Sequence, residues 1–169
     1  IYTVDEKEEP SAALFSKDDL TINGSGTLDI TASYKNGIQC KDTLKLVNTN
    51  LNITAENDGI KAKDALLIYK GSYMVKAQGD GIVTTNEKEQ GNLSIDQGTF
   101  AIEAQQDGLQ SAGDLTIYDG VFTVTSGGGS VNKISASSSP QPWGEFDDHD
   151  ETAEKSQKGI KAAKNMVLY

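Results

Sequence analysis

The chain has 169 residues and a formal net charge of −10, from 25 acidic and 15 basic residues. This length suits one domain with a sizeable core. The acidic excess argues against a nucleic-acid partner, because phosphate binding needs a basic face. No apolar run is long enough to span a bilayer, so membrane insertion is not expected. All the basic residues are Lys, so an anionic ligand would have to be held by Lys, by backbone donors or through a cation.

A short motif recurs along the chain: a polar residue, then Gly, then Ile or Leu. The steps between successive copies are 22, 22, 27 and 51 residues. A period in this range is typical of a solenoid. The copies are Asn36–Ile38, Asp58–Ile60, Asp80–Ile82, Asp107–Leu109 and Lys158–Ile160.

Each repeat contains three short stretches in which apolar and polar residues alternate. Such alternation indicates strands with one buried face, and equivalent residues fall into columns when the repeats are aligned. One inward column is aromatic and contains Tyr73, Phe100 and Phe122. The pattern predicts an all-β parallel β-helix of about five to six coils, each of three short strands, with turns at the Gly or Asn between the second and third strands.

The predicted domain organisation has three parts. Residues 1–10 are expected to form a leading strand or cap, and residues 11–169 the β-helix. Residues 127–157, rich in Gly, Ser and Pro and then acidic, are expected to form an inserted flexible surface loop. The sequence stops midway through a coil at Tyr169. It therefore reads as truncated at the C-terminal end, and the open edge is expected to pair with missing coils or with another chain.

Stacked carboxylates form the first candidate site. Asp58, Asp80 and Asp107 occupy one column, and Glu56 lies just upstream. Adjacent carboxylates repel one another, and Ca²⁺, which takes six to eight oxygen ligands, would relieve the repulsion. The alternative is that Asp-Gly is simply favourable turn chemistry, offset by Lys61 and Lys161.

Outward aromatic residues form the second candidate site. Tyr69 and Tyr118 share a column at the end of the second strand and could stack on sugar rings, with Lys61 and Lys161 as further carbohydrate contacts. The alternative is that they are ordinary exposed strand residues.

The chain has no nucleophile elbow, Ser-His-Asp set or zinc spacing, so an enzyme is not expected. The acidic stretch 145–151, which holds the lone His149, is expected to be a solvated loop.

The motifs together resemble a bacterial family of extracellular carbohydrate-binding β-helix proteins, whose described members bind cellulose and polygalacturonic acid. The resemblance rests on Ala13–Tyr34, the DGI coils, Ser126–Ser130 and Lys158–Ala162. It implies a right-handed parallel β-helix similar to the calcium-dependent pectate lyases. It also implies bound calcium, for which the matching positions are Asp58, Asp80 and Asp107.

These observations favour non-catalytic binding of a plant cell-wall polysaccharide, either polygalacturonate (pectin) or cellulose, assisted by calcium at the stacked Asp turns. A calcium-dependent polysaccharide lyase acting by β-elimination is the first alternative. A structural or adhesive surface solenoid without a sugar ligand is the second. The expected location is extracellular or at the bacterial cell surface.

Overall fold

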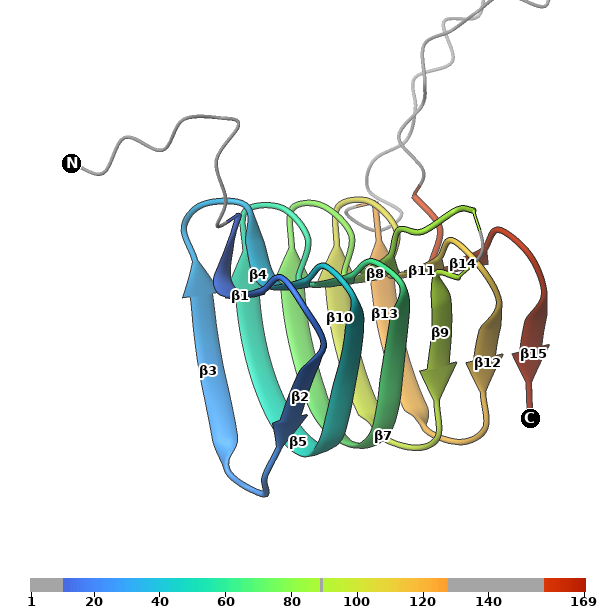
Figure 1. Cartoon of the computed structure of the whole chain (residues 1–169), viewed down its shortest axis with the longest axis horizontal. Coiled ribbons are helices and arrows are strands. Elements are labelled where there is room, and N and C mark those ends of the chain that lie inside the picture. Colours follow the sequence, from blue (N-terminus) through green and yellow to red (C-terminus); the bar gives the residue numbers. More distant parts are fainter. Residues whose placement is uncertain (1–10, 89, 128–156) are drawn as a thin grey trace, which may run out of the picture.

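A computed structural model describes residues 11–88, 90–127 and 157–169. Within these residues the chain is entirely β, and its strands stack side by side into a solenoid of about five turns (Figure 1). The predicted cap at residues 1–10, most of the predicted loop 127–157 and the acidic stretch around His149 lie outside the described residues. No helix in the described part is long and apolar enough to cross a membrane.

The strands of each coil belong to three rows. The first row forms a six-stranded parallel sheet, and the second and third rows are joined in a nine-stranded sheet. First-row strands are β1 (Ala12–Ser16), β4 (Asn36–Cys40), β6 (Ile60–Ala62), β8 (Ile82–Thr84), β11 (Leu109–Ser111) and β14 (Ile160–Ala162). The remaining strands are β2 (Leu20–Asn23), β3 (Thr27–Ala32), β5 (Thr43–Ala55), β7 (Ala65–Ala77), β9 (Asn92–Ile95), β10 (Thr99–Ala104), β12 (Leu115–Ile117), β13 (Val121–Ser126) and β15 (Met166–Leu168).

The pairing confirms the columns that the repeat predicts. Ile38 pairs with Ile60, and Ile60 pairs with Ile82, so the apolar residue after each Gly stacks on its equivalent in the next coil. In the aromatic column, the rings of Tyr73 and Phe100 stack with centroids 4.8 Å apart. Those of Phe100 and Phe122 are 4.5 Å apart. Stacked rings at the strand spacing fix both the inward face and the register of each coil.

The corner between the second and third strands differs from the prediction in two coils. In β5 and β7 the chain passes from the second row to the third without leaving the strand. The bend is absorbed by register shifts around Val47 and by Asn48, which adopts a φ of 53°. Asn tolerates this left-handed conformation, so the corner needs no separate turn.

Candidate functional site

The aspartate column is an inter-coil hydrogen-bond ladder. Oδ1 of Asp58 accepts the backbone N–H of Asp80 at 3.1 Å, and Oδ1 of Asp80 accepts that of Asp107 at 2.9 Å. Asp107 continues the ladder to the N–H of Lys158 at 2.7 Å. Asn36 begins it by accepting the N–H of Asp58 at 3.1 Å. Each side chain thus satisfies a backbone donor of the next coil.

Two lysines on the outer face of the first sheet offset part of the negative charge of this column. Lys61 Nζ lies 2.7 Å from Asp58 Oδ2, and Lys161 Nζ lies 3.4 Å from Asp107 Oδ2. In the two coils between them the equivalent positions are held by Val83 and Gln110, so Asp80 has no lysine in its own coil. Burial is the main cause that raises the pKa of Asp80, and the charges of Asp58 and Asp107 raise it further. The hydrogen bond from the Asp107 backbone lowers the pKa of Asp80, but by less than burial raises it.

The Gly that follows each Asp is required by packing. A Cβ at Gly59 would meet the side chain of Val75 and lie 2.6 Å from the carbonyl oxygen of Gly81. Gly37, Gly81 and Gly108 are enclosed in the same way by an Ile or Val of the third strand. The Asp-Gly-Ile repeat therefore encodes a hydrogen-bonding side chain, a close backbone approach and a core residue, in that order.

The fit of this column to a calcium ion rests on one feature. Oδ2 of Asp107 is buried and accepts no hydrogen bond from any described residue, and its ion-pair partner Lys161 Nζ lies 3.4 Å away. The Oδ1 atoms are engaged in the ladder, and Glu56 has an exposed side chain. Among the described residues, the carboxylates that gather within 4.8 Å of one another are at a different corner: Asp18, Asp19 and Asp42.

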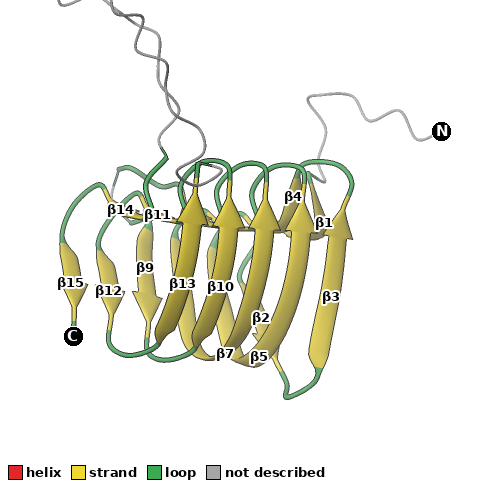
Figure 2. Ribbon diagram, turned by 180° about the vertical axis from the view of Figure 1, so that it is seen from behind, coloured by secondary structure: helices red, strands yellow, loops and turns green. Residues whose placement is uncertain are grey.

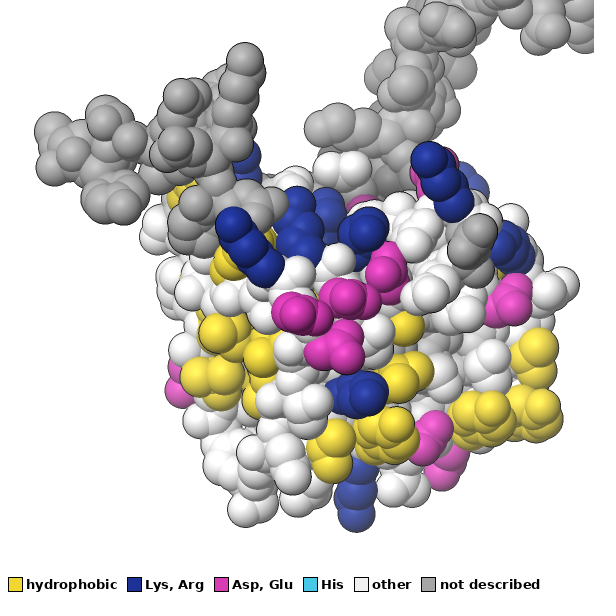
Figure 3. Space-filling model, in the orientation of Figure 1, with side chains coloured by type: hydrophobic (Ala, Val, Ile, Leu, Met, Phe, Trp, Pro, Cys, Tyr) yellow, Lys and Arg dark blue, Asp and Glu magenta, His cyan; other side chains and the backbone are white. Residues whose placement is uncertain are grey.

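The predicted aromatic column lies on another face of the solenoid. Ile68, Ile95, Ile117 and Leu168 pair in that order, and the residues that directly follow them share one position. Each later residue at this position donates its backbone N–H to the carbonyl of the Ile in the coil before. Figure 3 shows a row of apolar side chains, interrupted by acidic ones, running along the lower right of this face. We call the column the tyrosine row; its members are Tyr69, Asp96, Tyr118 and Tyr169.

The rings of the tyrosine row are open to solvent. Tyr69 is 44% exposed, Tyr118 is 51% exposed and Tyr169 is 80% exposed. The rings of Tyr118 and Tyr169 are stacked, with centroids 5.2 Å apart and planes 8° from parallel. Tyr69 and Tyr118 are two strand spacings apart, which is about 10 Å.

A polar hollow of about 540 Å³ lies directly beside the tyrosine row, at the corner where the second strands meet the third. We call it the corner trough. Its floor includes Gly71, Gly98 and Gly120, where a Cβ would approach the carbonyl of the preceding coil. Its walls carry amide, hydroxyl, ammonium and carboxylate groups from Asn48, Asn50, Lys70, Gln97, Thr99 and Asp119.

The structure thus divides the predicted site residues between two faces. Lys61 and Lys161 belong with the aspartate column. Tyr69 and Tyr118 directly precede two residues that line the corner trough, Lys70 and Asp119. Sequence reasoning missed Tyr169 and the trough residues. Tyr169 directly follows the Met-x-Leu of the last strand, just as Tyr118 directly follows the Leu-x-Ile of an earlier one. The repeat in the sequence therefore already places Tyr169 in the same column as Tyr118.

Comparisons with known proteins bear on the fold and the family of the chain. A family model described as "Carbohydrate-binding domain-containing protein" matches residues 2–169, and the chain belongs to this family. A protein of that same description from Acetivibrio thermocellus is 36% identical over 50 residues, which are 30% of this chain and 18% of the relative. A solved structure, described as the polysaccharide lyase-like protein from C. thermocellum in a gadolinium derivative, matches with a TM-score of 0.76 and 25% identity. The match covers 99% of this chain and 58% of that one, so the chain spans less than two thirds of either relative.

Proposed function

We propose that this chain binds a polysaccharide without cleaving it, and that the glycan lies along the tyrosine row and in the corner trough. The observation that carries the proposal is the set of three exposed tyrosines in register along the solenoid axis. Family membership supports the ligand class. The candidate ligands are plant cell-wall polysaccharides, namely cellulose and polygalacturonate, met outside the cell.

The chemistry of the two neighbouring features is complementary. An aromatic ring offers a flat apolar face against which the C–H face of a sugar packs, and tyrosine adds a hydroxyl at the wet end. The amides of Asn48, Asn50 and Gln97 can each donate and accept hydrogen bonds, as sugar hydroxyls require. Alternate rings of a β-1,4-linked glycan present the same face, which suits tyrosines placed two coils apart.

Binding without catalysis fits the environment of the lysines. A lysine that serves as general base needs a free lone pair, whereas Lys61 donates to Asp58 and Lys161 is paired with Asp107. Among the described residues, the outward positions of the first sheet that flank the aspartate column hold no lysine besides Lys61 and Lys161. The structural neighbour is called lyase-like, so release of unsaturated sugar ends is the outcome that would favour an enzyme.

Calcium is proposed as a structural aid to this function. Asp80 and Asp107 are the residues that would hold it, with Asp58 and Glu56 as further donors. The support is that the buried Asp107 Oδ2 accepts no hydrogen bond, although a cation there would compete with the Lys161 ammonium 3.4 Å away. The solved neighbour is a gadolinium derivative, and lanthanide ions are hard cations that take oxygen ligands, as Ca²⁺ does. The ion would add its own positive charge to a column of three carboxylates.

The test is depletion of the protein from solution by insoluble cellulose and by insoluble polygalacturonate, with calcium and then with a chelator. The paired substitution Tyr69→Ala with Tyr118→Ala is expected to weaken binding at least about tenfold. Tyr34→Ala is the matched control, because Tyr34 is 47% exposed but lies outside the row.

Three outcomes decide the proposal. An equal loss of polysaccharide binding in the Tyr34→Ala control and in the paired tyrosine variant would contradict the placement of the site. If the wild type bound neither polymer, the proposed function would be contradicted. Binding that survives the chelator would show that calcium is not required.

A further inference from the structure

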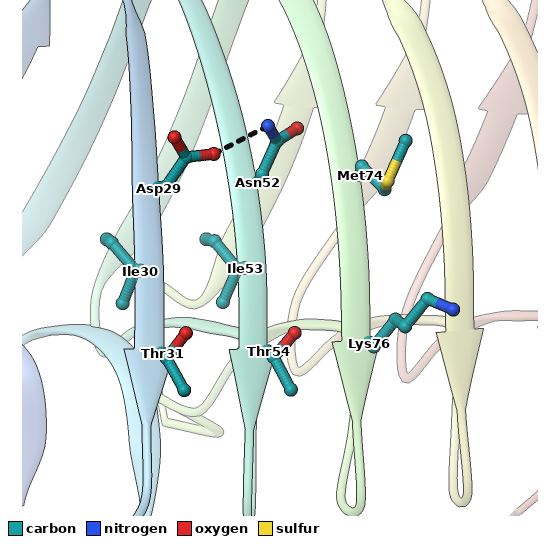
Figure 4. A pocket seen from close by; sticks show the side chains of 8 residues that line it. All are labelled: Asp29, Ile30, Thr31, Asn52, Ile53, Thr54, Met74 and Lys76. Carbon is teal, nitrogen blue, oxygen red and sulfur yellow. Dashed lines mark hydrogen bonds between the residues drawn. The ribbon is translucent and has the colours of Figure 1, made fainter.

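Two adjoining hollows cross the outer face of the third-row strands, which faces the viewer in Figure 2. The first is lined by side chains of β3, β5 and β7, including Asp29, Asn52 and Thr54 (Figure 4). The second continues over β10 and β13. Both are lined by Met74 and Lys76, so the two hollows adjoin at β7, and we call them together the sheet groove.

The groove runs along the solenoid axis across the third-row strands. Its walls are two outward rows of the same strands, because residues two apart point to the same side of a sheet. One row runs from Asp29 through Asn52 and Met74, and the other from Thr31 through Thr54 and Lys76. The rows lie about 7 Å apart, and five strands give a length of about 19 Å along the solenoid axis.

The lining is polar but nearly balanced in charge. Asn52 Nδ2 donates to Asp29 Oδ1 at 2.7 Å, and Lys76 Nζ lies 3.2 Å from Glu103 Oε2. The remaining polar groups are threonine hydroxyls, and Met74, which is 53% exposed, supplies an apolar patch midway. A neutral chain rich in hydroxyl groups matches these donors and acceptors. A polyuronate would place carboxylates beside Asp29 and Glu103, with one lysine to offset them.

We propose that the sheet groove is a second glycan-binding site, specific for a neutral chain, and that each molecule therefore holds two chains at once. This inference rests on the proposed function of the chain. The groove lies on third-row strands, whereas the tyrosine row ends the second-row strands, so the two sites use different residues. Two sites on one rigid solenoid would cross-link neighbouring polysaccharide chains and raise avidity.

The test is calorimetric titration of the whole chain with cellohexaose. The groove variant combines Thr31→Val, Thr54→Val and Ala101→Ile, which removes hydroxyls and fills the groove with residues that favour strands. All three positions are exposed. Thr21→Val, on the outer side of β2, is the matched control. We expect two molecules of cellohexaose per wild-type chain, one for the groove variant, one for the paired tyrosine variant and none when both are combined.

Each alternative result separates the two proposals. A single site that the tyrosine substitutions abolish would overturn the sheet groove and leave the proposed function in place. A single site that the groove substitutions abolish would support the groove and overturn the tyrosine placement. Absence of binding would overturn both. Hexagalacturonate is expected to bind the groove at least about tenfold more weakly, and equal affinity would contradict the neutral class.

Discussion

The aspartate column and the tyrosine row are built by the same repeat, yet they differ in what their side chains leave free. The ladder oxygens of Asp58, Asp80 and Asp107 are committed to backbone N–H groups of the next coil. The tyrosines present open rings beside a polar hollow. Periodicity alone therefore does not separate a structural column from a binding column. Counting the hydrogen bonds that each column already makes does separate them.

The largest effect is expected where the aspartate column meets the core. Gly59→Ala would force a Cβ against Val75 and the Gly81 carbonyl, and neither can move without shifting a coil. We expect a loss of about 3 kcal/mol in the free energy of unfolding, measured by urea denaturation. Gly26, where a Cβ would meet nothing, provides the control Gly26→Ala. Equal stabilities of the two variants would contradict the close packing behind the column.

The next prediction separates hydrogen bonding from charge at Asp80. Asp80→Ala leaves the Asp107 N–H without its acceptor and should cost about 2 kcal/mol. Asp80→Asn keeps an acceptor, as Asn36 does naturally at the start of the ladder, and should cost much less. Thermal unfolding in chelator measures both. A loss in the Asn variant as large as the loss in the Ala variant would contradict the hydrogen-bonding role of Asp80.

The pH dependence of stability sharpens the same comparison. The folded-state pKa of Asp80 is raised above its ordinary value of 3.8, first by burial. The carboxyl of Asp80 therefore loses its proton at lower pH in the unfolded chain than in the folded chain. As a result, the contribution of Asp80 to stability is present below pH 3.8 and is lost as pH rises through the folded-state pKa. Relative to Asp80→Asn, the wild type should lose stability as pH rises from 3.8. Unfolding in chelator at a series of pH values measures this difference, and a constant difference would contradict the burial of Asp80.

The smallest effect is expected for the lysine of the column. Lys61→Ala removes an ion pair that is partly exposed and should cost about 1 kcal/mol in stability. Polysaccharide binding should stay unchanged, because Lys61 lies on the first sheet and the tyrosine row lies elsewhere. Depletion by insoluble cellulose provides the measurement. A tenfold loss of binding with intact stability would instead move the site to the aspartate column.

Sequence reasoning predicted the part of the structure that repeats. The strand columns, the inward stack of Tyr73 and Phe100 and the outward position of Tyr69 follow from alternation and from a fixed period. The ladder role of Asp80 did not follow, because a side-chain bond to the next coil depends on rotamer and register together. The continuous corner at Asn48 was missed for a similar reason, since its left-handed φ is set by local context.

The sheet groove was missed because its residues share no type. Asp29, Asn52 and Met74 occupy one row, and only pairing and exposure make them neighbours across the sheet. Sequence alone reveals the columns in which one residue type recurs, whether buried, as at Tyr73 and Phe100, or exposed, as at Tyr69 and Tyr118. A surface column of mixed residue types becomes visible only when the coils are stacked.

The central claim is that the tyrosine row binds glycan while the aspartate column holds the coils together. The most direct measurement is a residue-resolved NMR titration with cellohexaose, following backbone amide shifts. The account predicts shifts at Tyr69, Asp96 and Tyr118 and at the neighbouring trough glycines, and unchanged signals at Asp58 and Asp80. Shifts confined to the aspartate column, with the tyrosine row unaffected, would contradict it.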